Sequence, residues 1–161
     1  MVRYTQKIAM WGIGISMAIA SLQFASRTIA QPDTFKSLTL NNQTTSGVMM
    51  GSTGGTTSLP AVVSNRDRQG QACIGFGDST PNHTLVLERP FSSLTIRVDS
   101  GGGDTTLLIS GPGGVRCADA GESGRDVRLQ QSDWQPGSYR VWIGTVTPRT
   151  NRDYRLIVRG N

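Results

Sequence analysis

The stretch Gly137-Ser-Tyr-Arg-Val-Trp-Ile-Gly144 decides the fold, because apolar residues recur in it at every second position. These apolar residues alternate with Arg140, Trp142 and Gly144. Successive side chains of a β-strand point to opposite faces of its sheet. The stretch therefore predicts a strand with one apolar face and one face that carries arginine and tryptophan.

The same period of two recurs in residues 94–99, 126–130 and 154–159. Residues 105–109 alternate less, which suits a more buried strand. Clusters of glycine and proline turn the chain tightly between these strands; they occupy 100–103, 111–114, 121–124 and 135–137. No stretch after residue 30 has a helical period over two turns. The sequence thus predicts an all-β fold, an antiparallel β-sandwich of jelly-roll type over residues 70–161.

The composition excludes several classes of protein. The chain has 161 residues, which is room for one domain of ordinary size. Glycine contributes 20 residues and only 17% are charged, which excludes a coiled coil or a helical bundle. A single long apolar run excludes a polytopic membrane protein. One histidine and two cysteines are too few for the zinc modules, which need more such ligands.

Residues 1–30 are predicted to be a signal peptide. Arg3 and Lys7 form a positive segment, and Ile8–Ala20 follows without a charge but is too short for a typical membrane-spanning helix. Thr28-Ile-Ala30 then offers small residues for cleavage before the next residue. An uncleaved membrane anchor is the alternative. In both cases the rest of the chain is expected outside the cytoplasm, in the periplasm or the medium.

Export changes what the net charge implies. The whole chain has 16 basic and 11 acidic residues, a net charge of +5. The signal peptide contains three basic residues and no acidic one, so the exported part keeps 13 basic and 11 acidic residues, a net charge of +2. So small an excess does not favour a nucleic-acid partner.

Residues 31–69 are predicted to be a low-complexity lead-in or linker. In residues 41–58, 15 of 18 positions are glycine or polar without charge. Such a segment buries too little apolar area to offset the entropy of ordering it. Its flanks are more apolar; residues 35–40 suit a short strand, and residues 59–63 form a second apolar patch. These flanks either dock on the domain or are simply tethered to it.

Cys73 and Cys117 are the two cysteines of the chain, and both fall in the exported part. An isolated pair in an oxidising compartment favours one disulfide between them. The alternatives are two buried free thiols and a reactive cysteine.

One motif raises the question of catalysis. Gly77-Asp-Ser79 is similar to the start of a group of lipases and esterases, which makes a small secreted hydrolase with Ser79 and His83 the alternative function. Those enzymes need a histidine base in a D-x-x-H element near the C-terminus, and the sequence has none. A serine hydroxyl without a base stays protonated and weakly nucleophilic. We therefore expect a non-enzymatic protein with no catalytic residues.

Arginines recur on the polar sides of the predicted strands and form a candidate ligand surface. An arginine fork binds carboxylates and sulfates in a bidentate manner, as in anionic polysaccharides. The alternative is an ordinary solvated sheet face. The candidate residues are Arg97, Arg128, Arg140, Trp142, Arg155 and Arg159.

Several blocks of residues 71–159 resemble the bacterial pre-peptidase C-terminal (PPC) domain, most of all its stand-alone secreted forms in cyanobacteria. The blocks are Cys73-Ile-Gly-Phe76, Pro81-Asn-His-Thr84, Asp104-Thr-Thr-Leu-Leu-Ile-Ser-Gly-Pro-Gly-Gly114, Cys117-Ala-Asp119, Trp134-Gln-Pro-Gly-Ser-Tyr-Arg-Val-Trp-Ile-Gly144 and Tyr154-Arg-Leu-Ile-Val158. The resemblance implies a jelly-roll β-sandwich that acts as a non-catalytic accessory. Its implied roles are adhesion and the binding of an extracellular polysaccharide or protein.

The resemblance also suggests a calcium site, because related sandwiches bind calcium. Asp119 and Glu122 could supply two carboxylates, and Asp104 or Asp99 a third. Calcium needs six to eight oxygens, so backbone carbonyls and water would have to complete the set. Two positions of the relatives' acidic cluster are alanine here, and an ion pair of these acids with Arg125 is the alternative.

Overall fold

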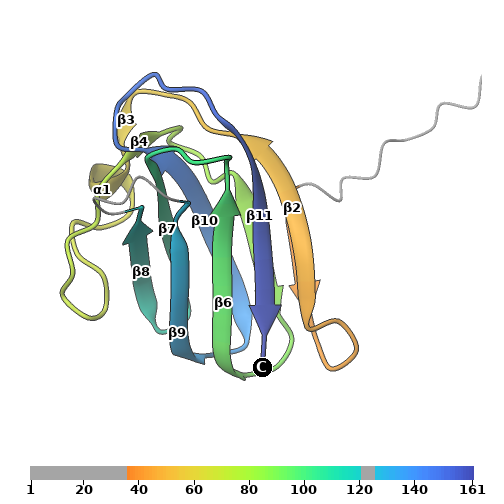
Figure 1. Cartoon of the computed structure of the whole chain (residues 1–161). Helices are drawn as coiled ribbons and strands as arrows, with labels where there is room; N and C mark the ends of the chain where they lie inside the picture. Colours follow the sequence, from red (N-terminus) through yellow and green to blue (C-terminus); the bar gives the residue numbers. More distant parts are fainter. Residues whose placement is uncertain (1–35, 121–125) are drawn as a thin grey trace, which may run out of the picture. The chain divides into compact units, whose positions relative to one another are not determined.

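Two β-sheets packed face to face form the part of the chain that the computed structural model describes, residues 36–120 and 126–161 (Figure 1). The predicted all-β sandwich is confirmed. The signal peptide predicted for residues 1–30 lies outside the described residues. Among the described residues, no helix is long and apolar enough to cross a membrane.

The four-stranded sheet is antiparallel throughout. Its order is β2 (Ser46–Ser52), β11 (Asp153–Gly160), β6 (Phe91–Asp99) and β9 (Arg128–Trp134). β2 and β9 are therefore the edges of this sheet (Figure 1).

The seven-stranded sheet is mixed. Its strands are β1 (Ser37–Leu40), β3 (Thr57–Ser58), β4 (Phe76–Gly77), β5 (His83–Leu87), β7 (Thr105–Gly111), β8 (Gly114–Asp119) and β10 (Gly137–Thr145). β10 is central and pairs with β5 and β4 on one side and β7 on the other. β1 runs parallel to β5, which the prediction of an antiparallel sandwich did not include. This pairing sets Leu40 beside Leu87, and both are buried.

The main core lies between the two sheets and consists of the inward residues of the alternating strands. Phe91, Trp134 and Tyr139 are three of its large aromatic members, each at most 1% exposed, and Tyr154 is the fourth, at 4%. The indole N–H of Trp134 donates to the carbonyl of Gln131, and the Tyr139 hydroxyl donates to that of Gln135. The polar atoms of these rings are thus satisfied inside the sandwich.

The predicted lead-in is wrong for the part of it that the structure describes. β2 pairs with β11 over seven residues, from Ser46 opposite Arg159 to Ser52 opposite Asp153. Two of its glycines leave room for the core, since a Cβ at Gly47 would meet Leu38 and a Cβ at Gly51 would meet the Tyr154 hydroxyl. Composition alone misleads here, because pairing and close packing supply the stabilisation that the short side chains lack.

A second, smaller core covers part of the outer face of the seven-stranded sheet. Leu59 of α1 (Leu59–Val62) packs there with Cys73, Leu108 of β7 and Trp142 of β10. The helix is one short turn with Pro60 at its start. Residues 105–109 of β7 are consequently buried on both faces, which agrees with the more buried strand that their sequence predicts.

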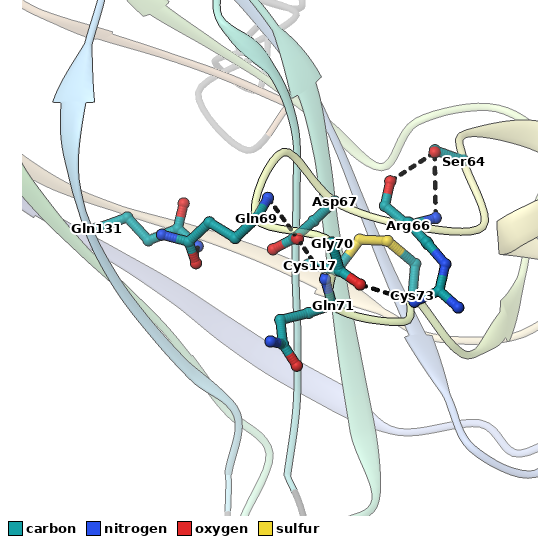
Figure 2. Close-up of a disulfide and its surroundings, with 9 residues drawn as sticks. All are labelled: Ser64, Arg66, Asp67, Gln69, Gly70, Gln71, Cys73, Cys117 and Gln131. Atoms are coloured by element: carbon teal, nitrogen blue, oxygen red, sulfur yellow. Dashed lines mark hydrogen bonds between the residues drawn. A yellow bond between two sulfur atoms is a disulfide. The ribbon is translucent and has the colours of Figure 1, made fainter.

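A disulfide between Cys73 and Cys117 fastens this cover to β8, with Cα atoms 5.5 Å apart (Figure 2). The predicted pairing is confirmed. Cys73 lies in the loop before β4, where Asp67 Oδ1 accepts the backbone N–H groups of Gln69 and Gln71 at 2.8 and 2.9 Å. The loop is therefore ordered by its own hydrogen bonds as well as by the disulfide.

Candidate functional site: an arginine face on the four-stranded sheet

Four of the six predicted ligand-surface residues lie together on the outer face of the four-stranded sheet. Their neighbours along the strands are buried in the core, so the alternation of each strand turns the arginines outward. They are Arg97 of β6, Arg128 of β9, and Arg155 and Arg159 of β11, all exposed.

The strand register brings three of these arginines around one depression. Arg97 is directly opposite Arg128 on one side and Ile157 on the other, while Arg159 is opposite Thr95. These five residues line an open depression of about 130 Å³. Its size suits one sulfate or carboxylate group rather than a drug-sized ligand.

The charge of this face is only partly neutralised. Arg97 Nη2 is 3.2 Å from Asp126 Oδ2 and 3.9 Å from Asp99 Oδ1. Arg128 donates instead to the neutral side chain of Gln130, at 3.2 Å. Within the described ranges, Arg128, Arg155 and Arg159 form no ion pair. Like charges directly opposite each other destabilise a sheet, so the Arg97–Arg128 pair is unfavourable for folding alone.

Asp126 organises the border of the arginine face. Its Oδ1 accepts hydrogen bonds from the backbone N–H groups of Ser100 and Gly102 and from the Ser100 hydroxyl. Burial opposes ionisation of this carboxyl, but those bonds and the one from Arg97 outweigh burial and lower the pKa of Asp126 to about 2. The carboxylate thus stays charged and holds the 100–103 turn and Arg97 in place.

The two other predicted ligand-surface residues lie on the other sheet. Arg140 is exposed on β10, with its guanidinium carbon 5.5 Å from the centre of the Trp142 ring. Trp142 is 3% exposed, and its indole N–H donates to the carbonyl of Ser79 at 3.2 Å. The prediction that Trp142 belongs to a ligand surface is wrong, because α1 and the Cys73 loop cover the part of this face where Trp142 lies.

The structure does not bring Ser79 and His83 together as a nucleophile and its base. His83 is 3% exposed, and its Nε2 lies 2.8 Å from the hydroxyl of Tyr154 inside the sandwich. Ser79 is exposed on the preceding turn. Burial raises the pKa of Tyr154, so its hydroxyl stays protonated beside the imidazole.

The calcium set is not assembled by the residues that the structure describes. Asp104 shares a shallow pocket with Arg152 and the threonines Thr145, Thr147 and Thr150. Asp119 is exposed at the end of β8, and Glu122 lies outside the described residues. In residues 36–120 and 126–161, no three histidine, cysteine or acidic side chains gather in a way that could hold a metal ion.

Sequence reasoning missed Thr95, Ile157 and Asp126 as parts of the site. Thr95 and Ile157 occupy the outward positions between the arginines, so the alternation pattern could have included them once the strand register was known. Asp126 lies 29 residues from Arg97, and nothing in the sequence marks this contact.

Comparisons with known proteins leave the family open. No protein-family model matches the chain, and no curated protein matches it. Among solved structures, the chain is similar to a periplasmic inhibitor of g-type lysozyme from Aeromonas hydrophila, PliG, with a TM-score of 0.43 and 11% identity. That match covers 78% of this chain and 96% of the inhibitor. A likeness this weak transfers no activity, and the resemblance to PPC domains stays a prediction.

Proposed function

We propose that the protein is a non-catalytic binding module that works in the periplasm or outside the cell and binds an anionic polysaccharide. The outer face of the four-stranded sheet is the binding surface. The observation that carries this proposal is the in-register grouping of Arg97, Arg128 and Arg159 around one open depression, with Arg155 beside it.

The shape of the site favours a polymer over a small molecule. A small ligand is usually enclosed in a pocket of at least ~300 Å³, whereas this depression is open and holds one charged group. Arginine side chains on neighbouring strands, ~4.8 Å apart, present several forks along a flat surface. Carboxylates or sulfates spaced along a sugar chain can engage these forks one after another.

Two features support a non-catalytic role outside the cytoplasm. The Cys73–Cys117 disulfide is typical of an oxidising compartment. His83, the single histidine of the chain, is engaged inside the sandwich and away from solvent. The predicted signal peptide agrees with this location.

Binding of dextran sulfate and polygalacturonate, with neutral dextran as the reference, tests the proposal. We expect the double variant Arg128→Gln/Arg159→Gln to bind either polyanion at least tenfold more weakly at low salt, because it loses two charge-assisted contacts. Arg140→Gln removes the same type of charge from the other sheet and is the matched control.

Equal losses in the double variant and in Arg140→Gln would contradict the proposed surface. Tight binding of neutral dextran would contradict the anionic class. Failure of both polyanions, with capture of an acidic protein that depends on Arg128 and Arg159, would replace the polysaccharide by a protein partner.

A further inference from the structure

Strand β2 is an unusually unprotected sheet edge. Among the described residues it pairs with β11 alone and forms one edge of its sheet (Figure 1), and it also contacts β1 of the other sheet. Natural edge strands usually carry a lysine, a proline or a bulge that prevents pairing with another chain. Ser46–Ser52 has no charged residue and no proline, and its pairing with β11 is continuous over all seven residues.

The sequence of this edge is nearly the same in both directions. Residues 45–53 read Thr-Ser-Gly-Val-Met-Met-Gly-Ser-Thr, with Met49 at the centre. Thr45 matches Thr53, Ser46 matches Ser52 and Gly47 matches Gly51. The remaining pair, Val48 and Met50, is apolar on both sides. An antiparallel pair of such strands would place like beside like along its whole length.

Packing inside the protein explains only part of this symmetry. Met49 is buried in the core, and the two glycines make room for Leu38 and Tyr154. Val48 and Met50 point outward and are 43% and 49% exposed. Val48 is opposite Ile157 and Met50 is opposite Arg155 on the outer face of the sheet. These neighbours cover only part of each side chain, which leaves an apolar surface at the edge of the sheet.

The opposite edge strand of the same sheet, β9, is by contrast occupied by a contact with β8 and carries charged residues. Arg116 of β8 is fully buried there and donates to the carbonyl of Asp133 in β9 at 2.9 Å. Asp133 has a positive φ of 61°, which turns that carbonyl out of the β6 ladder. The charged groups Arg128 and Asp133 also lie on β9. Of the two edges, only β2 can accept another strand without meeting a charge.

We propose that β2 pairs antiparallel with β2 of a second copy, with Met49 opposite Met49. Val48 of each copy then lies beside Met50 of the other, and two four-stranded sheets become one continuous sheet. The pairing buries one strand edge and two apolar side chains per copy, less than the ~800 Å² per partner of a standard stable interface. The dimer is therefore weak and forms at high local concentration.

This pairing extends the proposed function, and its benefit for binding rests on that function, because it requires the arginine face to bind a polyanion. Five strand spacings separate Arg97 of one copy from Arg97 of the other, on the order of 25 Å. Both arginine groups lie on the same face of the joined sheet. A single polyanion long enough to span that distance binds both groups, and the second contact benefits from a high effective concentration.

Sedimentation velocity over a concentration series, without any polyanion, tests the pairing separately from ligand binding. We expect the mass of the wild-type protein to rise toward twice that of the monomer. Val48→Lys/Met50→Lys should stay monomeric, because four lysines would meet at the joined edges. Gln130→Lys/Ser132→Lys adds the same charge to exposed positions of β9 and should associate like the wild type.

Disulfide cross-linking tests the register. A mixture of the Val48→Cys and Met50→Cys proteins should form mostly the heterodimer, because these positions are direct cross-strand neighbours in the proposed pairing.

A wild-type protein that stays monomeric at every concentration would overturn the proposal. Equal yields of both homodimers and the heterodimer would contradict the proposed register. A dimer that still forms in Val48→Lys/Met50→Lys would show that the copies associate through a different interface. Loss of polyanion binding alone leaves the pairing intact and contradicts only the proposed function.

Discussion

At the scale of single residues, Asp126 links the fold to the site. One oxygen of its carboxylate fixes the 100–103 turn through three hydrogen bonds, and the other holds Arg97 at 3.2 Å. The turn and the arginine belong to the border and the centre of the same sheet face. A single ionised group therefore sets both the local backbone and the orientation of one binding residue.

We expect Asp126→Asn to lower the free energy of unfolding at pH 7 by about 2 kcal/mol. The pKa of this group is about 2 in the folded protein and ~3.9 in the unfolded chain. Because folding lowers the pKa, its stabilisation is complete above pH ~4 and is lost as the pH falls from ~4 to ~2. Urea unfolding at several pH values should show the difference between wild type and variant shrinking over that interval.

Asp99→Asn is the matched control for this prediction, since Asp99 reaches Arg97 only at 3.9 Å. Its effect should be within ~0.5 kcal/mol, as for most exposed ion pairs. A difference between wild type and Asp126→Asn that stays constant from pH 7 to pH 2 would show that the carboxylate does not act through its charge.

Arg116 shows a different use of a buried arginine. It is fully buried, and burial, followed by the nearby charge of Arg68, lowers its pKa. It is held by the Asp133 carbonyl and by the Trp134 ring, whose centre is 4.1 Å from the guanidinium carbon. Arg116 thus connects β8 with β9. The sequence alone does not distinguish such a buried arginine from a surface arginine.

At the scale of elements, alternation in the sequence was a reliable guide to strands and to their inward sides. It predicted β6, β10 and β11, and the less alternating 105–109 stretch predicted a more buried strand, which is β7. It did not predict β2, because its glycines and serines are typical of linkers. What makes β2 a strand is its pairing with β11, together with the close approach of Leu38 to Gly47 and of Tyr154 to Gly51, which only the folded chain contains.

The disulfide should stabilise one element in particular, the cover that α1 and the Cys73 loop place over β7, β8 and β10. The cysteines are 44 residues apart. Closing a loop of that length in the unfolded chain corresponds to about 4 kcal/mol in the chain-entropy model. We therefore expect Cys73→Ser/Cys117→Ser to lower the free energy of urea unfolding by roughly 3–4 kcal/mol.

Two comparisons make the disulfide prediction specific. Reduction of the wild type should reproduce the loss seen in the double serine variant, and the variant itself should not respond to the reductant. Arg140→Gln, on the same sheet but exposed, should change stability by less than ~0.5 kcal/mol. An unchanged unfolding curve after full reduction would contradict a stabilising role.

At the scale of the whole sandwich, the difference between its two outer faces decides where the site lies. The second core covers part of the outer face of the seven-stranded sheet and buries Trp142 there, whereas the four-stranded sheet leaves Arg97, Arg128, Arg155 and Arg159 exposed. The sequence placed the five candidate arginines on outward positions but could not tell which of the two sheets would leave its outer face open. That choice depends on a helix and a loop from residues 59–75, which contact β7, β8 and β10 across a long separation in the chain.

An open arginine face also predicts how a ligand changes the stability of the folded protein. A ligand that binds the folded state alone raises its stability, by about 2.7 kcal/mol at 100 times the dissociation constant. We expect dextran sulfate to raise the melting temperature of the wild type at low salt. The rise should vanish near 1 M NaCl, where the Debye length falls to ~3 Å and exposed charges are screened. Neutral dextran should cause no shift, and Arg128→Gln/Arg159→Gln should lose most of the shift at low salt. A shift that persists at high salt, or that is the same in this variant and in the wild type, would mean that the polymer acts by excluded volume or at another surface and not through the arginine face.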